Sequence, residues 1–205
     1  MAYAIARRLA ERRRTVTLAG RSQEGAERLA STLVAEGADA ARIEATTAAR
    51  PIAGDVVMLA IPYTAAVALA ETRGDELAGR IVVDLTNPVD WDTMDALVTP
   101  PGRSGAEEIA RKLPRSAAVV KAFNTTFAKR LSRTPSSEHP LDLFVAADDE
   151  DAKQQLAELC EGTGLRLIDA GPLRRARELE ALGFLHISLQ DRLGTGFETA
   201  IEVVR

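Results

Sequence analysis

Short apolar runs alternate along the chain with longer stretches in which apolar residues recur every three or four positions. Runs that are apolar at consecutive positions are typical of strands buried on both faces of a parallel sheet. The predicted strands are Val16–Ala19, Val56–Ile61, Ile81–Leu85, Val119–Phe123, Leu143–Ala146 and Leu165–Ile168, with a weaker candidate at Arg42–Ala45. The predicted helices are Ala2–Arg13, Gln23–Glu36, Thr64–Thr72, Ala106–Leu113, Thr126–Leu131, Glu150–Gly162 and Arg174–Gln190. This alternation predicts an α/β protein with a doubly wound, mostly parallel sheet.

Local signals refine this organisation. Ser104 and Glu107 have the spacing of a capping box at a helix start. Asp169–Pro172 is predicted to form a turn before the last helix, and 87–103 a loop over one edge of the sheet. No repeat or linker divides the chain. We therefore expect one domain over residues 1–205, in which about 172–205 form a C-terminal helix and tail.

Composition excludes several classes of protein. The 205 residues carry a formal net charge of −4 with 46% hydrophobic residues, which argues against a nucleic-acid or anionic-membrane surface. Cys160 is the single cysteine and lies in a helical pattern, so we expect a small buried hydrophobe and no metal site. No apolar run approaches the ~18 residues that span a membrane. We expect a soluble, cytoplasmic protein, with His139 at its surface.

The turn after the first predicted strand carries an arginine. Residues 15–22 form an apolar strand that ends in Gly20, Arg21 and Ser22. In a dinucleotide-binding fold, an acidic residue in this turn selects NAD, whereas an arginine pairs with the 2′-phosphate of NADP. Ser22 is also suited to cap the next helix, whose N-terminus favours an anion. We expect these residues to bind NADP(H), although a surface arginine beside an ordinary helix cap has the same pattern.

A dinucleotide site normally begins with a strand and a G-x-G-x-x-G turn ahead of its first helix. Here the first predicted helix starts at the first residues of the sequence. We therefore expect the first strand and its Gly-rich turn to be absent. That strand would be central, between 16–19 and 56–61, so its absence would leave two unpaired edges and a chain of low stability, unless another segment or a neighbouring chain fills the gap.

Three further strand ends are predicted to meet at the carboxyl edge of the sheet. One ends in Ile61, Pro62 and Tyr63, the next in Asn87 and Pro88, and the third in Asn124 and Thr125. Each alone is a common strand-to-loop sequence. Together they outline a pocket for a small molecule.

These segments carry a resemblance to a known family. The similar segments are 60–63, 84–88, 104–108, 120–125 and 169–173, and they occur in order along almost the whole chain. They are similar to the NADPH:coenzyme F420 oxidoreductases and their bacterial relatives, and to the N-terminal domain of the six-transmembrane ferric reductases. Members begin with a strand and Gly-x-Gly-Asn-x-Gly, and Ala2 stands where the third glycine would be. The chain thus resembles a member clipped by about a dozen residues.

The resemblance implies a Rossmann oxidoreductase that moves a hydride between NADPH and a deazaflavin such as coenzyme F420. The 2′-phosphate would lie on Arg21 and Ser22. The nicotinamide would lie near Ile61, Pro62, Asn87 and Asn124, beside Tyr63, Pro88 and Thr125. The acceptor would pack against the helix that carries Leu182, Phe184 and His186. The family also implies a homodimer formed through the C-terminal helices.

Several alternatives stay open at this point. No catalytic side chain is assigned, because direct hydride transfer needs proximity more than an acid or base. His186 is the one candidate for a proton relay, and a hydrogen-bonded core histidine is the competing interpretation. Asn124 stands where the archetypal deazaflavin enzymes have histidine. The chain could therefore be an accessory reductase for an imine, enone or flavin, or a degenerate nucleotide- or partner-binding module without catalysis.

Overall fold

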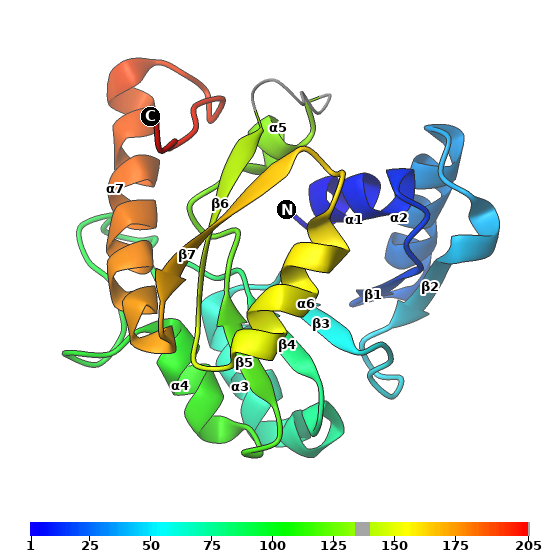
Figure 1. Ribbon diagram of the computed structural model, residues 1–205, viewed down its shortest axis with the longest axis horizontal. Helices are drawn as coiled ribbons and strands as arrows, with labels where there is room; N and C mark the ends of the chain where they lie inside the picture. The colour runs from blue at the N-terminus through cyan, green and yellow to red at the C-terminus, as the bar shows by residue number, and fades with distance from the viewer. Residues whose placement is uncertain (134–139, 205) are drawn as a thin grey trace.

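The computed structural model describes residues 1–133 and 140–204, so the prediction for His139 lies outside it. Its strands form two sheets (Figure 1). A two-stranded parallel sheet contains β1 (Val16–Gly20) and β2 (Ile43–Thr47). A five-stranded sheet contains, in spatial order, β3 (Val56–Leu59), β4 (Ile81–Asp84), β5 (Ala118–Lys121), β6 (Leu141–Ala147) and β7 (Leu165–Gly171). Every pair is parallel except β5 with β6, which is antiparallel.

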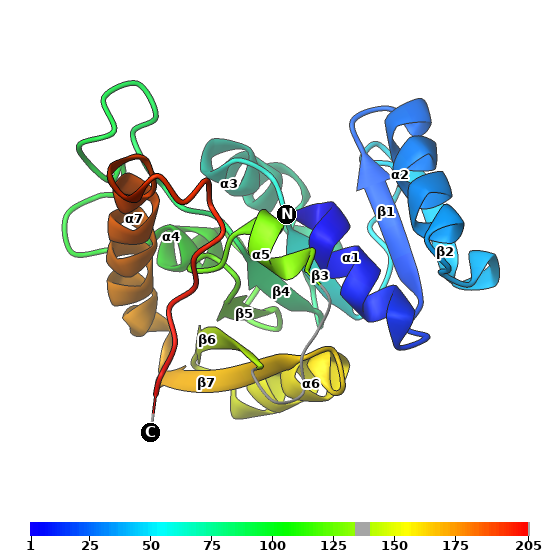
Figure 2. The same cartoon turned by 90° about the horizontal axis from the view of Figure 1, so that it is seen from above.

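Helices cover both faces of the larger sheet. They are α1 (Ala2–Glu11), α3 (Tyr63–Arg73), α4 (Gly105–Lys112), α5 (Ala128–Leu131), α6 (Glu150–Cys160) and α7 (Ala176–Leu193), whereas α2 (Gln23–Ala35) packs on the two-stranded sheet. Ile81 and Val83 of β4 face a core that α1 and α6 complete, whereas Val82 faces a second core with α3 and α4. This two-sided burial explains why the strands are apolar at consecutive positions. Figure 2 shows α6 on the side of the sheet opposite α3 and α4.

Helix α1 packs against both sheets. Its Ile5 and Leu9 belong to the core of the larger sheet, whereas Ala6 packs with Leu18 of β1 and Leu33 of α2. In the part of the chain that the structure describes, β1 and β3 share no ladder, and α1 lies between them in Figure 2. The expectation that a strand is missing between them stays a prediction.

The predicted elements all occur, with some corrected bounds. The predicted strand 119–123 ends at Lys121, because Phe123 has a left-handed backbone with φ of 63°. The helix predicted from Thr126 begins only at Ala128, since the Thr126 N–H donates to the carbonyl of Phe123 in a turn. Asp169, Ala170 and Gly171 extend β7 alongside β6, so the turn predicted at 169–172 is wrong.

Two local predictions are confirmed. Ser104 accepts a hydrogen bond from the Glu107 N–H, and the Glu107 side chain accepts one from the Ser104 N–H, which is the predicted capping box at the start of α4. Cys160 is a buried free cysteine, and burial raises the pKa of its thiol to about 12. Within the described residues, no helix is both long and apolar enough to cross a membrane.

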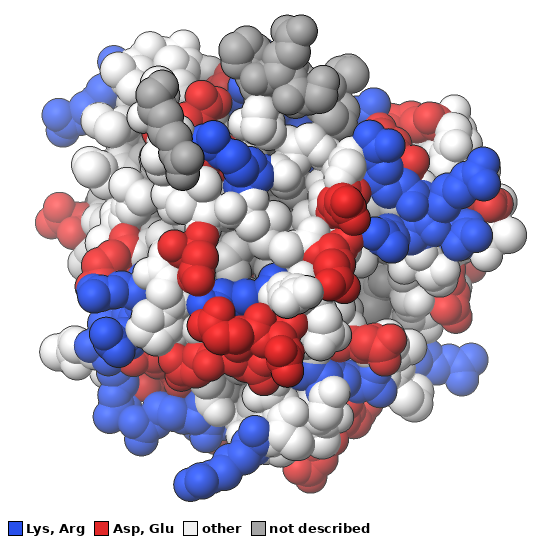
Figure 3. Space-filling model, viewed as in Figure 1, with Lys and Arg blue, Asp and Glu red and all other residues white. Residues whose placement is uncertain are grey.

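Charges of both signs are distributed over the surface. On the face in Figure 3, acidic side chains gather over the N-terminal end of α6, where Asp149, Glu150 and Asp151 lie. Asp149 caps this helix by accepting from the Ala152 N–H at 2.9 Å. Negative charge at a helix N-terminus is favourable because it opposes the helix dipole. This acidic cluster therefore has a structural explanation.

Candidate functional site

A buried ion cluster lies where β4 and β5 end. Asp84 and Lys121 are the last residues of these strands and are paired in register. The Lys121 ammonium donates to Asp84 Oδ2 at 2.8 Å and to the carbonyl of Thr86 at 2.5 Å, and lies 2.9 Å from Glu180 Oε1. The side chains of Asp84 and Lys121 are 0% exposed and that of Glu180 is 1% exposed. The lysine thus ties two strand ends to α7.

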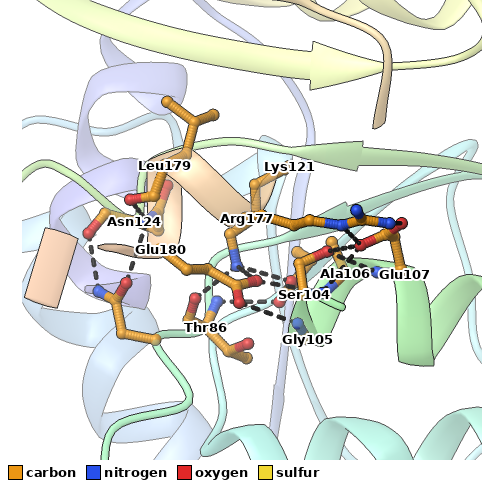
Figure 4. Close-up of polar contacts among 12 residues, drawn as sticks. Thr86, Ser104, Gly105, Ala106, Glu107, Lys121, Asn124, Arg177, Leu179 and Glu180 are labelled. Atoms are coloured by element: carbon orange, nitrogen blue, oxygen red, sulfur yellow. Dashed lines mark hydrogen bonds and ion pairs between the residues drawn. The ribbon is translucent and has the colours of Figure 1, made fainter. Parts of the chain in front are cut away.

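Glu180 also caps another helix. Its carboxylate accepts hydrogen bonds from the backbone N–H of Gly105 at 2.9 Å and of Ala106 at 3.3 Å, at the start of α4 (Figure 4). Burial raises the pKa of Glu180, and the neighbouring Lys121 opposes that rise. Burial alone would lower the pKa of Lys121, but attraction to Asp84 and Glu180 outweighs it, and the pKa is raised. Lys121 is therefore charged at neutral pH.

A pair of asparagines lies next to the ion cluster. The Asn87 side chain donates to the backbone carbonyl of Asn124 at 2.7 Å, and the Asn124 side chain donates to Asn87 Oδ1 at 3.0 Å. The second amide proton of Asn124 bonds the carbonyl of Leu179 in α7 at 2.8 Å. Asn124 is 4% exposed. Both predicted asparagines are thus brought together in fixed orientations.

The backbone of α7 lies directly against this asparagine pair. A Cβ at Gly183 would lie 2.7 Å from Asn87 Oδ1 and 2.9 Å from Asn124 Nδ2. These separations are shorter than any van der Waals contact, so glycine is required here for close approach. The neighbouring Leu182 and Phe184 are half-buried.

Three polar atoms near the strand ends have no hydrogen-bond partner among the described residues. They are Thr86 Oγ1, Asn124 Oδ1 and Thr125 Oγ1, and all three are buried. Buried polar atoms are normally satisfied, so unsatisfied ones need a water, a ligand or another explanation. Phe123, just ahead of Asn124, holds a left-handed backbone that is uncommon for a residue with a side chain. The left-handed residue and the unsatisfied atoms together make these strand ends the candidate ligand site.

His186 is enclosed rather than open. Its Nδ1 lies 3.2 Å from the carbonyl of Thr125 and its Nε2 lies 2.8 Å from Thr199 Oγ1. The Phe127 ring packs against the imidazole with centroids 4.3 Å apart. Burial lowers the pKa of His186, and the contact with Thr125 opposes this. The geometry favours the interpretation of His186 as a hydrogen-bonded core histidine over a proton relay.

The remaining predicted residues lie at other strand ends. Arg21 is exposed and follows β1, in the two-stranded sheet. Ser22 caps α2 as predicted, accepting from the Gly25 N–H at 3.2 Å. Pro62 is the N-cap residue of α3 and Ile61 is 38% exposed. The structure therefore joins the asparagines to α7 and leaves the Arg21 turn on the other sheet.

Sequence reasoning missed four residues of the site. Asp84 and Lys121 lie in the segments 84–88 and 120–125 but are not predicted as site residues, and neither are Glu180 and Gly183. The available signal was a charged residue three positions ahead of each asparagine. Nothing local in the sequence indicates that Glu180 meets them, since it belongs to a helix much later in the chain.

Helices on both faces of a mostly parallel sheet, with polar strand ends against a C-terminal helix, define a Rossmann-like α/β protein. Residues 1–88 match the family described as NADP oxidoreductase, coenzyme F420-dependent. The F420-dependent NADP reductase of Methanocaldococcus jannaschii is 33% identical over 160 residues, which cover 73% of this chain and 70% of that protein. The chain belongs to this F420-dependent NADP oxidoreductase family, which confirms the resemblance.

Two further relatives extend the match over nearly the whole chain. The F420-dependent NADP reductase of Methanothermobacter thermautotrophicus is 32% identical over 195 residues, covering 92% of this chain and 84% of that protein. A solved structure from Arthrobacter sp. FB24, provisionally described as an F420-dependent NADP-reductase, has a TM-score of 0.78 at 26% identity. It covers 98% of this chain and 96% of its own. The similarity therefore includes β6, β7 and α7 as well as the N-terminal half.

Proposed function

We propose that this protein is an oxidoreductase that transfers a hydride between NADPH and coenzyme F420 or a similar planar acceptor. The observation that carries the proposal is the Asn87–Asn124 pair, which is held at two adjacent strand ends beside unsatisfied polar atoms. Family membership supplies the class of reaction.

The residues present offer groups for two parts of NADP(H), the 2′-phosphate and the nicotinamide. Arg21 is exposed at the carboxyl end of β1, and a guanidinium can bind a 2′-phosphate through two hydrogen bonds. Ser22 places the start of α2, with its favourable dipole, in the same turn. At the other strand ends, Asn124 Oδ1 and Thr125 Oγ1 are buried acceptors without a partner among the described residues, and they match the N–H donors of a carboxamide such as that of nicotinamide. Ile61, Pro62, Tyr63 and Pro88 would border the same ring.

When bound, NADPH supplies the hydride at its nicotinamide ring. The chain's own residues bind and orient the two partners and keep water away from them. Two titratable side chains of this region already have partners: Lys121 is paired with two carboxylates, and His186 has a partner at each ring nitrogen. A transfer that needs orientation rather than a protein acid or base suits such a site. Leu182 and Phe184 would form the apolar wall for the acceptor.

Arg21→Ala tests the cofactor assignment. A charge-assisted hydrogen bond contributes about 1.5–3 kcal/mol, so the variant should bind NADPH roughly ten- to a hundredfold more weakly. The affinity for NADH should hardly change, because NADH has no 2′-phosphate. Fluorescence titration with each nucleotide measures both affinities.

Arg115→Ala provides the matched control. Arg115 is an exposed arginine in the loop before β5, at the opposite edge of the sheet, and its removal should leave both affinities unchanged. Equal losses of NADPH and NADH affinity in Arg21→Ala would remove Arg21 from the phosphate site. With the cofactor established, absorbance changes of F420 and of flavins mixed with NADPH identify the acceptor.

A further inference from the structure

Three segments of the site repeat one spacing. On β4 and the loop after it, Asn87 follows Asp84 by three positions. On β5 and its loop, Asn124 follows Lys121 by three, and on α7 Gly183 follows Glu180 by three. The first member of each pair belongs to the ion cluster and the second to the asparagine contact. The site is therefore built of two adjoining layers that share the same three segments.

Helix geometry links the two layers on α7. Residues three apart lie on the same face of an α-helix, separated by about 4.5 Å along its axis. The position of Glu180 therefore determines where Gly183 meets the asparagines. Leu179 strengthens the link, because its carbonyl accepts the hydrogen bond from Asn124.

Glu180 is anchored by buried contacts to two other elements. Its carboxylate accepts from Gly105 and Ala106 of α4 and is paired with Lys121 of β5, and all of these contacts are buried. We infer that Glu180 is a positioning residue that holds α7 in the register at which Gly183 and Leu179 orient the side chain of Asn124. The inference rests on the proposed function, in which Asn124 contacts the nicotinamide.

The contacts of Glu180 specify both its charge and its length. Among the described residues, its carboxylate accepts from one ammonium and two backbone N–H groups. In Glu180→Gln, an amide NH2 group would face one of these donors and could not accept from it. In Glu180→Asp the charge remains, but the shorter side chain can reach its partners only if α7 moves. Both substitutions should therefore disturb Asn124 although neither touches it.

The chain offers an unusually direct readout of this effect. Asn87 and Asn124 are its only two asparagines in the full sequence. Protein with ¹⁵N-labelled asparagine therefore gives NMR signals from two side-chain NH2 groups, and both groups belong to the candidate site. Asn87→Ser assigns them. In the wild type, both amide protons of Asn124 are hydrogen-bonded and should exchange slowly with solvent.

Glu180→Gln and Glu180→Asp should each move the Asn124 signals towards free-amide positions and speed their exchange about tenfold or more. Gly183→Ala should do the same with the ion cluster intact, because its Cβ displaces the pair directly. Arg177→Gln is the matched control: it removes the two hydrogen bonds from Arg177 to Glu107, which also join α7 to α4 but at the exposed surface. This control should leave both signals unchanged.

Asn124 signals that stay at their wild-type positions in a folded Glu180 variant would overturn the inference. An equal effect of Arg177→Gln on the Asn124 signals would also overturn the inference, because it would mean that any contact holding α7 to α4 positions Asn124. If Glu180→Gln does not fold, Glu180→Asp decides by the same criterion, because it preserves the charge balance.

Kinetics separates this inference from the proposed function. Glu180→Asp should lower kcat roughly ten- to a hundredfold, because Asn124 no longer orients the nicotinamide correctly. The Kd for NADPH should change by less than about threefold. Wild-type protein that binds no NADPH would refute the proposed function and leave the NMR result standing. Normal NADPH binding with unmoved Asn124 signals would refute the role of Glu180 alone.

Discussion

At the scale of single residues, His186 makes the stability of the folded protein depend on pH. Burial lowers its pKa, so the folded protein resists its protonation, whereas the unfolded chain protonates it near the ordinary value of about 6.5. A group of this kind contributes stability above the unfolded pKa and loses it as the pH falls from there towards the folded pKa. We therefore expect stability to decrease below about pH 6.5.

Thermal unfolding of wild type and His186→Gln between about pH 7.5 and 5.5 tests this expectation. The wild type should lose more Tm on acidification than the variant, which cannot titrate at this position. Glu76 does not interfere, because its contact with Arg73 lowers its pKa to about 2 and its contribution is lost only in stronger acid. Parallel losses in both proteins would show that His186 titrates normally in the fold.

At the scale of elements, α4 begins with a closed set of hydrogen bonds. Ser104 is fully buried, caps the helix and exchanges hydrogen bonds with Glu107. Loss of such a cap costs about 1 kcal/mol, so Ser104→Ala should lower Tm by about 2–4 °C. Calorimetry measures the change.

Ser31→Ala serves as the comparison for this cap. Ser31 is exposed inside α2, where alanine is the better helix former, so its variant should be neutral or slightly more stable. If Ser104→Ala behaved like Ser31→Ala, the capping box would contribute nothing to stability.

The positions of strands and helices could be predicted from this sequence better than the contacts between them. The strand at 81–84 was predictable because Ile81, Val82 and Val83 are all buried, against two different cores. The antiparallel pairing of β5 with β6 could not be predicted, because the apolar pattern of a buried strand is the same in either direction. Asn87 and Asn124 could be grouped as strand ends, whereas Glu180 enters the site only through tertiary packing of α7.

At the scale of the whole molecule, α7 and the segment after it lie at one side of the protein (Figures 1 and 2), and some of their apolar side chains are exposed. Leu185 is 55% exposed, Leu193 58% and Phe197 43%. We propose that this surface pairs with the same surface of a second copy, since exposed apolar side chains can mark interaction sites.

Light scattering at micromolar concentration should therefore give the mass of a dimer. Replacement of Leu185 and Leu193 together by glutamate should give a folded monomer. Val34→Glu, which places the same charge on an exposed apolar position of α2, should leave the dimer intact. A wild-type monomer, or a dimer that survives both glutamates, would contradict this assignment.

Because both asparagines lie in the candidate site, the structure also bears on the chemical stability of the protein. Spontaneous deamidation of asparagine begins with attack on the side chain by the backbone nitrogen of the next residue. Asn87 precedes Pro88, which has no N–H to attack with, and the amide of Asn124 is buried between two acceptors. We therefore expect deamidation to be slow at both asparagines of the chain. Any deamidation at asparagine in this chain would therefore alter the candidate site.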